Sequence, residues 1–334
     1  MANELTKRRL GRTELMVTEL SLGGYMFTGE FGVPQDEAHA IMDAAFASGV
    51  NFIDTAQMYG FGEGEEMAGR ALRRFADRPI HVATKVGYLD RTIVRNLGDA
   101  AYADEDALRR AIRHSLWLLQ RDHIDIVFVH EPDRANWWGD GLLSGKAPVL
   151  GVLEQFKAEG VVGAIGIGGW ICDNIADLIE TGRFDVALVA GGYTLVKQPV
   201  RERVIPAARK HDVGLVIGGT FFQGFLASIR RQDMLDMQAS GEYGFFDAET
   251  VRRILAVYDL CEETGLSITD MAIRYILADP DIHAIIPGAQ RVSHIEANIQ
   301  AALAGTLPEE LVKRIDAITS SASANSARAP LCSG

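Results

Sequence analysis

Four ionisable residues stand at or just after the ends of short apolar runs in the sequence. Asp54 ends the run NFID, Tyr59 follows five residues later, Lys85 ends HVATK and His130 ends DIVFVH. A charged group at the end of a buried segment costs several kcal/mol unless another group pairs with it. The acid, the phenol, the amine and the imidazole complement one another, so the pattern predicts that they form one network.

The chemistry open to such a network is narrow. A phenol of ordinary pKa, about 10, becomes a general acid or base near neutral pH when a neighbouring ammonium stabilises its phenolate. Tyr59 and Lys85 supply this pair, and Asp54 supplies a carboxylate that holds the ammonium. The imidazole of His130 can donate a hydrogen bond to a carbonyl oxygen and stabilise the alkoxide that forms when hydride reaches the carbon.

Each of the four residues also has an ordinary structural explanation. Asp54 could cap a helix, Tyr59 could line a loop, Lys85 could form a structural ion pair and His130 could be a core residue with its hydrogen bonds satisfied. The catalytic interpretation requires that all four residues meet at one end of the fold. Whether they do depends on how the strands that carry them are arranged.

Eight apolar runs alternate with amphipathic stretches at intervals of about 30 residues, the length of a strand-helix unit. Near-continuous apolar runs are typical of parallel strands covered on both faces. Eight such units predict a single (β/α)₈ TIM barrel, because no GxGxxG follows any of the strands. The runs are ELSLGGYMF, VNFIDTA, IHVATKV, IDIVFVHEP, VGAIGIGG, FDVALVAGG, VGLVIGG and HAIIPGA.

The whole chain, residues 1–334, is expected to form a single barrel domain. KRRLGRTELMVTEL is expected to form an N-terminal hairpin, and about 320–334 a flexible tail. Long connections after the fourth strand (133–147) and the seventh (225–248) are expected to shape a pocket at the C-terminal face.

Composition limits the kinds of partner. The net charge is −12, and Lys and Arg are scattered among acids, which argues against nucleic acid or a membrane and favours a small molecule. A homo-oligomer is possible. Three separated cysteines without a CxxC, and no signal or membrane segment, predict a cytoplasmic protein. The eight histidines include no HxH at a strand end, so a metal-dependent hydrolase is disfavoured and no metal is expected.

The sequence resembles the aldo-keto reductase superfamily in the pattern of Asp54, Tyr59, Lys85 and His130. The resemblance extends from LGRTELMVTELSLGG through FIDTAQMYG, ATKVG, VHEPD and EGVVGAIGIGG to IIPGAQRVSHIEANI. It implies a barrel with a nicotinamide cofactor over its mouth and the adenosine end held after the eighth strand. The cofactor residues so implied are Gly23, Gly24, Tyr25, Asp54, Gly168, Tyr193, Gly218, Thr220, Phe221, Gln223, Gly224, Ile286, Gly288, Ala289, Gln290, Arg291, His294 and Asn298.

Several of these positions depart from the family pattern. Gly288 and His294 stand where many members place cations that bind the 2′-phosphate of NADP, which leaves Arg291 as a candidate cation. The sequence therefore favours NADP weakly over NAD. Gly218 stands where many relatives stack a tyrosine on the nicotinamide, so a neighbour such as Tyr193 is expected to help position the ring.

The departures resemble the branch that contains D-threo-aldose, L-fucose and pyridoxal dehydrogenases, which implies a sugar-like or cyclic hydroxylated substrate. Hydride transfer between nicotinamide and a carbonyl or secondary alcohol is the expected reaction. The alternative is a cofactor-binding, redox-sensing regulatory subunit with little turnover. The expected substrate pocket, whose aromatic members could equally be core residues, consists of Tyr25, Tyr59, His130, Glu131, Trp137, Trp138 and Trp170.

Overall fold

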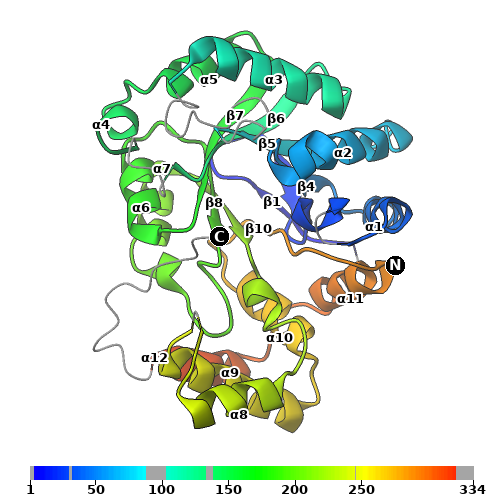
Figure 1. Ribbon diagram of the computed structural model, residues 1–334, viewed down its shortest axis with the longest axis vertical. Coiled ribbons are helices and arrows are strands. Elements are labelled where there is room, and N and C mark those ends of the chain that lie inside the picture. The colour runs from blue at the N-terminus through cyan, green and yellow to red at the C-terminus, as the bar shows by residue number, and fades with distance from the viewer. Residues whose placement is uncertain (1–3, 30–31, 88–102, 133–137, 245, 321–334) are drawn as a thin grey trace.

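The computed structural model describes residues 4–29, 32–87, 103–132, 138–244 and 246–320. Its centre is an eight-stranded parallel sheet in which neighbours along the chain are neighbours in space, as successive strand-helix units require. The predicted (β/α)₈ barrel is confirmed (Figure 1). The strands are β3 (Leu22–Gly23), β4 (Phe52–Asp54), β5 (His81–Val86), β6 (Ile124–His130), β7 (Val162–Gly169), β8 (Val186–Ala190), β9 (Gly214–Gly218) and β10 (Ala284–Ile285).

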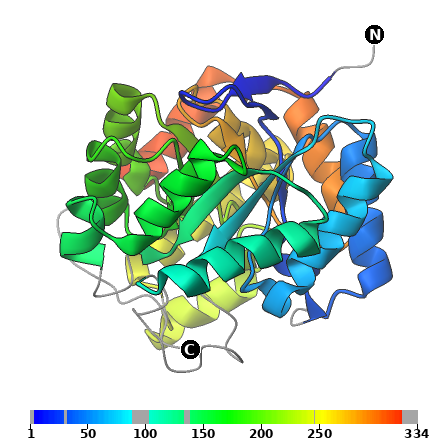
Figure 2. The same cartoon turned by 90° about the horizontal axis from the view of Figure 1, so that it is seen from above.

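The first and last strands meet, which closes the sheet on itself. Leu20 forms a parallel bridge with Ile285, whose N–H donates to Glu19 O at 2.8 Å and whose carbonyl accepts from Ser21 N at 2.9 Å. Closure leaves no open sheet edge and gives every strand two neighbours. Seen from above, the strands lie in the middle of a ring of helices (Figure 2).

The predicted N-terminal hairpin is formed by β1 (Lys7–Arg9) and β2 (Met16–Thr18), which pair antiparallel. It covers the end of the barrel where the strands begin. Leu10 and Val17 are fully buried and join Phe52, Ile126 and other interior side chains of the barrel. The hairpin therefore fills this end with apolar side chains.

Gly11, in the turn of the hairpin, is required by a close approach to β9. Its φ is 56°, and a Cβ at this position would lie 2.1 Å from the backbone nitrogen of Gly214. Only glycine combines the left-handed conformation with so close a contact.

Helices between the strands bury one face against the barrel. On α3, Leu108, Ile112 and Leu119 are buried whereas Trp117 is 72% exposed, as amphipathic spacing requires. Asp104 caps this helix by accepting from Ala107 N. The surrounding helices are α1 (Gln35–Ala47), α2 (Glu63–Arg74), α3 (Glu105–Leu119), α5 (Pro148–Ala158), α6 (Cys172–Glu180), α7 (Val204–His211), α10 (Ile268–Leu277) and α11 (Val292–Leu303).

The two long connections predicted from the sequence contain helices of their own. The connection after β6 includes α4 (Trp138–Leu143), and the one after β9 includes α8 (Arg231–Ser240). Two more helices, α9 (Ala248–Thr264) and α12 (Glu309–Ser320), lie beside each other and are joined by an ion pair between Arg314 and Glu263. The predicted flexible tail, apart from Ser320 at the end of α12, and residues 133–137 lie outside the described residues.

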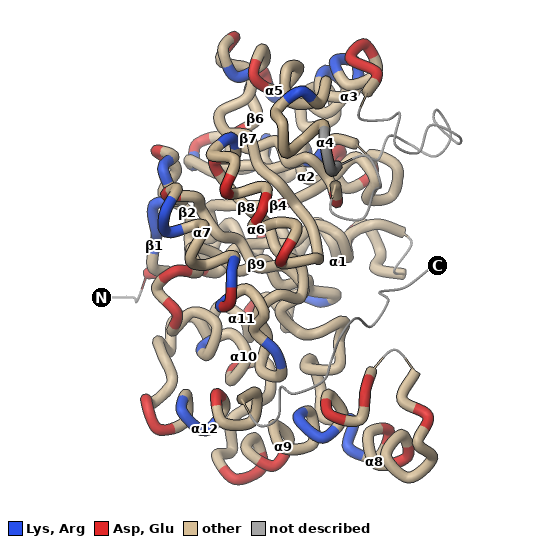
Figure 3. The backbone as a smooth tube through the Cα atoms, turned by 90° about the vertical axis from the view of Figure 1, so that its left-hand side faces the viewer, with Lys and Arg blue, Asp and Glu red and all other residues tan. Residues whose placement is uncertain are grey.

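Charged residues of both signs alternate along the described chain (Figure 3). Many form ion pairs between neighbouring helices, such as Arg74 with Asp43 at 2.6 Å. Within the described residues, no helix is both long and apolar enough to span a membrane.

Asp185, just before β8, holds three segments together at the hairpin end of the barrel. It accepts hydrogen bonds from Arg12 Nε at 2.9 Å, Lys157 Nζ at 2.5 Å and Ile165 N at 2.9 Å. Burial raises the pKa of this carboxyl, but hydrogen bonds from Lys157, Ile165 and Arg12 outweigh burial and leave the pKa below its usual value.

We predict that Asp185→Asn lowers the free energy of unfolding by about 2 kcal/mol at pH 7, because buried donors lose a charged acceptor. A carboxyl with a lowered folded-state pKa stabilises the fold above its unfolded-state pKa, and this stability is lost as pH falls through the folded-state value. The difference from wild type should therefore shrink between pH 5 and pH 3, measured by urea unfolding.

The matched control is Asp212→Asn, which removes an exposed ion pair with Arg9 at the same end. Exposed pairs contribute little, so this variant should unfold almost like wild type. Equal costs for the two substitutions would contradict the role given to Asp185.

Candidate active site

The barrel brings the four ionisable residues to the end where its strands finish. Asp54 ends β4 and His130 ends β6, while Lys85 lies on β5 between them, one residue before the strand ends. Tyr59 begins the 3₁₀ turn η3 (Tyr59–Gly62), which follows β4 and leads into α2. Parallel strands in register place their carboxyl ends together, which is why sequence positions so far apart meet here.

The ammonium of Lys85 is the centre of this cluster. Its Nζ donates to Asp54 Oδ2 at 2.6 Å, to the Thr55 carbonyl at 2.8 Å and to the Tyr59 hydroxyl at 2.9 Å. Lys85 and Asp54 are each 2% exposed. The structure thus joins the predicted acid, amine and phenol directly, and adds a backbone carbonyl that the sequence analysis missed.

Burial dominates the protonation of this cluster. It raises the pKa of Asp54 and lowers that of Lys85, and the contact between the two opposes both shifts. Burial also raises the pKa of Tyr59 well above 10, and the carboxylates of Asp54 and Glu131 raise it further. The phenol therefore keeps its proton in the free protein, which is the form that can donate to a carbonyl oxygen.

His130 faces the phenol across the same end of the barrel. The ring centroids of Tyr59 and His130 are 6.1 Å apart with planes at 80°. His130 is 5% exposed, so its imidazole is held in place by packing. A carbonyl oxygen placed beside both rings can meet the phenolic proton donor and the imidazole together.

Three residues predicted for the substrate pocket surround this point. Tyr25 packs edge-on against Tyr59 with ring centroids 4.9 Å apart, and is 47% exposed. Glu131 has a left-handed backbone with φ of 48°, rare for a residue with a side chain and typical of functional sites. Its Oε1 accepts from Trp170 Nε1 at 2.7 Å. Trp137 lies outside the described residues, as does the side chain of Trp138.

Most of the residues predicted to bind a cofactor follow strand ends at this same face. They lie at the end of β3 and directly after it (Gly23, Gly24 and Tyr25), at the end of β4 (Asp54), on β7 (Gly168), at the end of β9 and beyond (Gly218, Thr220, Phe221, Gln223 and Gly224), after β10 (Ile286, Gly288, Ala289, Gln290 and Arg291) and on α11 (His294 and Asn298). The segment after β9 has positive φ at Gly219, Phe222, Gln223 and Gly224, so its backbone is folded into a tight loop.

Tyr193 also follows a strand end, that of β8, but its side chain makes its contacts elsewhere. Its side chain is fully buried, its hydroxyl donates to Asp279 Oδ2 at 2.9 Å and also accepts from Arg201. Asp279 lies in the connection before β10, at the hairpin end of the barrel. The hydroxyl is thus committed to a structural network away from the ring of strand ends.

Unpartnered polar atoms test whether these segments fit a nicotinamide cofactor. Asp54 Oδ1, Thr220 Oγ1 and Asn298 Nδ2 are buried and have no hydrogen-bond partner among the described residues. Buried polar atoms without partners are rare in proteins. All three belong to residues predicted to bind the cofactor, and they fit a ligand that carries hydroxyl, phosphate and amide groups.

Two neighbours of these segments were not expected from the sequence. Glu37 on α1 accepts from Val292 N, in the first turn of α11, at 2.8 Å. Met26 packs so closely that its Cγ would lie 2.8 Å from a Cβ at Gly288. No local pattern marks either residue, because both contacts join segments more than 250 positions apart in the sequence.

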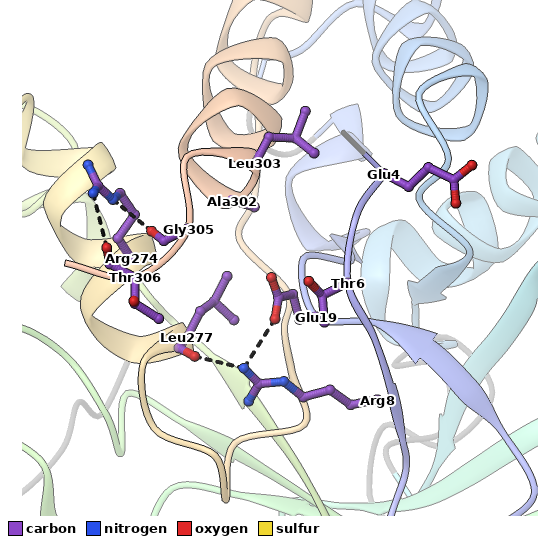
Figure 4. Close-up of a pocket in the computed structure, with 10 residues that line it drawn as sticks. All are labelled: Glu4, Thr6, Arg8, Glu19, Arg274, Leu277, Ala302, Leu303, Gly305 and Thr306. Atoms are coloured by element: carbon purple, nitrogen blue, oxygen red, sulfur yellow. Dashed lines mark hydrogen bonds and ion pairs between the residues drawn. The ribbon is translucent and has the colours of Figure 1, made fainter. Parts of the chain in front are cut away.

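A cavity of about 340 Å³ lies at the hairpin end (Figure 4). Its two cations are already bonded: Arg8 pairs with Glu19 at 3.1 Å and donates to Leu277 O, and Arg274 donates to Gly305 O and Thr306 O. We interpret this cavity as a structural junction between hairpin, α10 and α11. Among the described residues, no group of three or more His, Cys, Asp or Glu is arranged to hold a metal ion.

We predict that Asp54→Asn lowers the free energy of unfolding by about 3 kcal/mol, because it leaves a buried ammonium without its carboxylate. The double variant Asp54→Leu with Lys85→Met replaces the pair by apolar groups of similar size and should recover most of that loss. Urea unfolding at pH 7 measures both. A double variant no more stable than the single one would contradict a buried ion pair.

Comparison with known proteins agrees with this geometry. The family model for the "Aldo/keto reductase family" matches residues 19–320. D-threo-aldose 1-dehydrogenase of Pseudomonas sp is 29% identical over 80% of this chain and 83% of its own length. Pyridoxal 4-dehydrogenase of Microbacterium luteolum is 28% identical over 88% of this chain and 92% of its own length.

A solved structure supports the fold. An aldo-keto reductase from Bacillus halodurans, in its holo form, has a TM-score of 0.71 at 23% identity and covers 96% of this chain and 98% of its own. The family match spans every strand of the barrel together with Asp54, Tyr59, Lys85 and His130. The chain therefore belongs to the aldo/keto reductase family and is an oxidoreductase.

Proposed function

We propose that this enzyme transfers hydride between a nicotinamide cofactor and a carbonyl or secondary-alcohol carbon, with Tyr59 as the general acid and base. The observation that carries the proposal is the bonding of Lys85, which touches both Asp54 and the phenol that faces His130. Hydride comes from, or goes to, the nicotinamide when it is bound. The protein's part is to hold the carbonyl oxygen and move a proton to it.

The roles of the four side chains follow from their contacts. Tyr59 donates its proton to the oxygen of the carbonyl group, and Lys85, 2.9 Å from the phenolic oxygen, stabilises the phenolate that remains. Asp54 keeps Lys85 charged in a buried place. His130 approaches from the other side and orients the carbonyl oxygen by hydrogen bonding, stabilising the charge that develops there.

For the substrate we propose a sugar-like or cyclic hydroxylated compound. Glu131 and Trp170 form a fixed polar pair beside the phenol, which suits hydroxyl groups adjacent to the reacting carbon. Tyr25 supplies an apolar, half-exposed wall against a ring. The relatives named for an aldose and for pyridoxal, both hydroxylated, support this choice.

We place the enzyme in the cytoplasm, acting on a small molecule.

For the cofactor we propose NAD(P), held by the segments after β9 and β10 and by Asn298. Two features oppose each other at the adenosine end. Arg291 offers a cation for the 2′-phosphate of NADP, the form that the sequence weakly favours. Glu37 places a carboxylate on the first turn of α11, where helix N–H groups would otherwise attract a phosphate. We infer that Glu37 limits the preference for NADP.

The proton-transfer role of the phenol is tested by Tyr59→Phe. Turnover should fall by about 100-fold or more, because the general acid is lost, while the Kd for the cofactor stays within about twofold. Steady-state kinetics with a panel of sugars and cyclic ketones, and fluorescence titration of NAD(P)H, measure the two quantities.

Tyr275→Phe is the matched control, since it removes a buried hydroxyl bonded to Asp316, far from Lys85. It should keep wild-type turnover. Normal turnover in Tyr59→Phe would refute the role of the phenol. Tight cofactor binding by wild type without turnover on any substrate would support the regulatory-subunit alternative instead.

The effect of Glu37 is tested by Glu37→Gln. Removing a negative charge next to the bound 2′-phosphate should improve the affinity for NADPH about fivefold relative to NADH, as one charge at a helix N-terminus contributes about 1 kcal/mol. Asp36→Asn removes a neighbouring acid for which no contact with α11 is described, and should leave the ratio of the two Kd values unchanged. A ratio that responds equally to both substitutions would contradict this assignment.

A further inference from the structure

A second polar cluster is buried directly behind the catalytic residues, between the barrel wall and helices α2 and α3. Glu65 on α2 is fully buried, and its Oε1 accepts from Thr84 Oγ1 at 2.5 Å. Gln57 Nε2 donates to Ser115 Oγ at 3.0 Å and to the Ala111 carbonyl at 2.6 Å. The first bond joins helix α2 to strand β5, and the other two join the loop after β4 to helix α3.

The cluster lies next in sequence to Tyr59, the proposed proton donor, and to Lys85, whose ammonium bonds the phenol. Thr84 precedes Lys85 on β5 and Gln57 precedes Tyr59 by two positions. Side chains alternate along a strand: Ala83 belongs to the barrel interior and Val82 to the outer layer, so Thr84 faces the helices while Lys85 faces inward. The cluster therefore holds, from behind, the backbones that carry the ammonium and the phenol.

The hydrogen-bond balance of the cluster indicates a neutral acid. Glu65 Oε2 and Gln57 Oε1 are buried acceptors with no donor among the described residues. If Glu65 were ionised, its negative charge would lie among acceptor oxygens that already lack donors. If Glu65 is protonated, its carboxyl group supplies one more hydrogen-bond donor to the cluster. Burial raises the pKa of Glu65 to about 7, although its polar neighbours Thr84 and Ser115 oppose this rise.

We propose that Glu65 is a positioning residue for proton transfer, whose buried carboxyl ties α2 to β5 through Thr84. Because α2 directly follows the turn that carries Tyr59, this tie sets the distance between the Tyr59 hydroxyl and the Lys85 ammonium. The inference rests on the proposed function of these two groups. It adds a residue that touches neither substrate nor cofactor.

A consequence for pH follows from the charges around Lys85. The carboxylates that raise the pKa of Lys85 are Asp54 on β4, Glu131 after β6 and Glu65 on α2, against the lowering effect of burial. Tyr59, whose hydroxyl bonds Lys85, and His130, on β6 beside the Tyr59 ring, are further ionisable groups near it. Glu65→Gln removes one anion above pH 7, so Lys85 should lose its proton at lower pH, and the alkaline limb of the kcat profile should move to lower pH.

The experiment compares Glu65→Gln, Glu65→Leu and Thr84→Val with wild type. In Glu65→Gln, the amide oxygen still accepts from Thr84 and the amide N–H groups offer donors to the cluster. The kcat at pH 6.5 should therefore stay within about threefold of wild type, while the alkaline limb of the kcat profile moves to lower pH. Glu65→Leu and Thr84→Val break the tie, and kcat should fall about 100-fold and tenfold, since a displacement near 1 Å costs up to about 100-fold. The KM for cofactor should be unchanged.

The control is Asp125→Asn, at the other end of β5 and β6, where Asp125 bonds His81 Nδ1 at 2.8 Å and Val82 N at 2.9 Å. It should lower the melting temperature yet keep kcat and its pH profile. Loss of kcat in Asp125→Asn equal to that in Thr84→Val would reduce Glu65 to a stability residue and overturn the proposal. A Glu65→Gln profile that overlays wild type would do the same.

A readout that needs no turnover separates this proposal from the proposed function. Infrared difference spectra of wild type against Glu65→Gln should show a protonated-carboxyl band at pH 6 that disappears as pH rises through about 7. A wild type without turnover but with this band refutes the reaction and leaves Glu65 as a buried neutral acid. Absence of the band at pH 6 overturns the Glu65 assignment. Thr84→Val, which differs from wild type by one hydroxyl, provides the kinetic test even where Glu65→Leu does not fold.

Discussion

A buried ammonium has to find oxygen partners, and Lys85 finds all three within a few residues of one loop. Without them the cation would cost several kcal/mol or lose its proton. This requirement fixes the chain after β4: the Asp54 carboxylate and the Thr55 carbonyl must turn inward, and the loop must return so that Tyr59 lies over the amine. The return is tight, and Gly60, Phe61 and Gly62 all have positive φ.

The two ends of the barrel differ: one end is filled mainly by packing side chains, and the other holds the ionisable cluster. At the end where the strands begin, Leu10 and Val17 of the hairpin fill the interior, and Asp185 bonds three segments. At the other end, Lys85 bonds a carboxylate and a phenol, and Asp54 Oδ1 is buried without a partner among the described residues. A buried polar cluster of this kind is unfavourable for folding, and the apolar packing at the first end and around the barrel offsets that cost.

Much of this arrangement could be predicted from the sequence, because strand ends are visible as the ends of apolar runs. The prediction that Asp54, Lys85 and His130 share one face needs only the register of parallel strands. Tyr193 shows the limit of such reasoning: it follows β8, but its hydroxyl bonds Asp279, which is 86 positions away and leaves no local signal. Glu65, in contrast, did leave a local signal in the sequence. It shares the buried face of α2 with Ala68 and Leu72, where an acidic residue is unusual.

In the mechanism that we propose, the charges around the Tyr59 phenol affect carbonyl reduction and alcohol oxidation differently. Asp54 and Glu131 both oppose loss of its proton, and burial opposes it more strongly. The resting enzyme thus holds the proton that reduction of a carbonyl consumes, whereas oxidation of an alcohol begins from a phenolate, which these same groups disfavour. Only a ligand that brings positive charge, or that withdraws Glu131 into its own hydrogen bonds, relieves part of this opposition. In the reaction that we propose, the Glu131 carboxylate therefore links recognition of substrate hydroxyl groups to the loss of the Tyr59 proton.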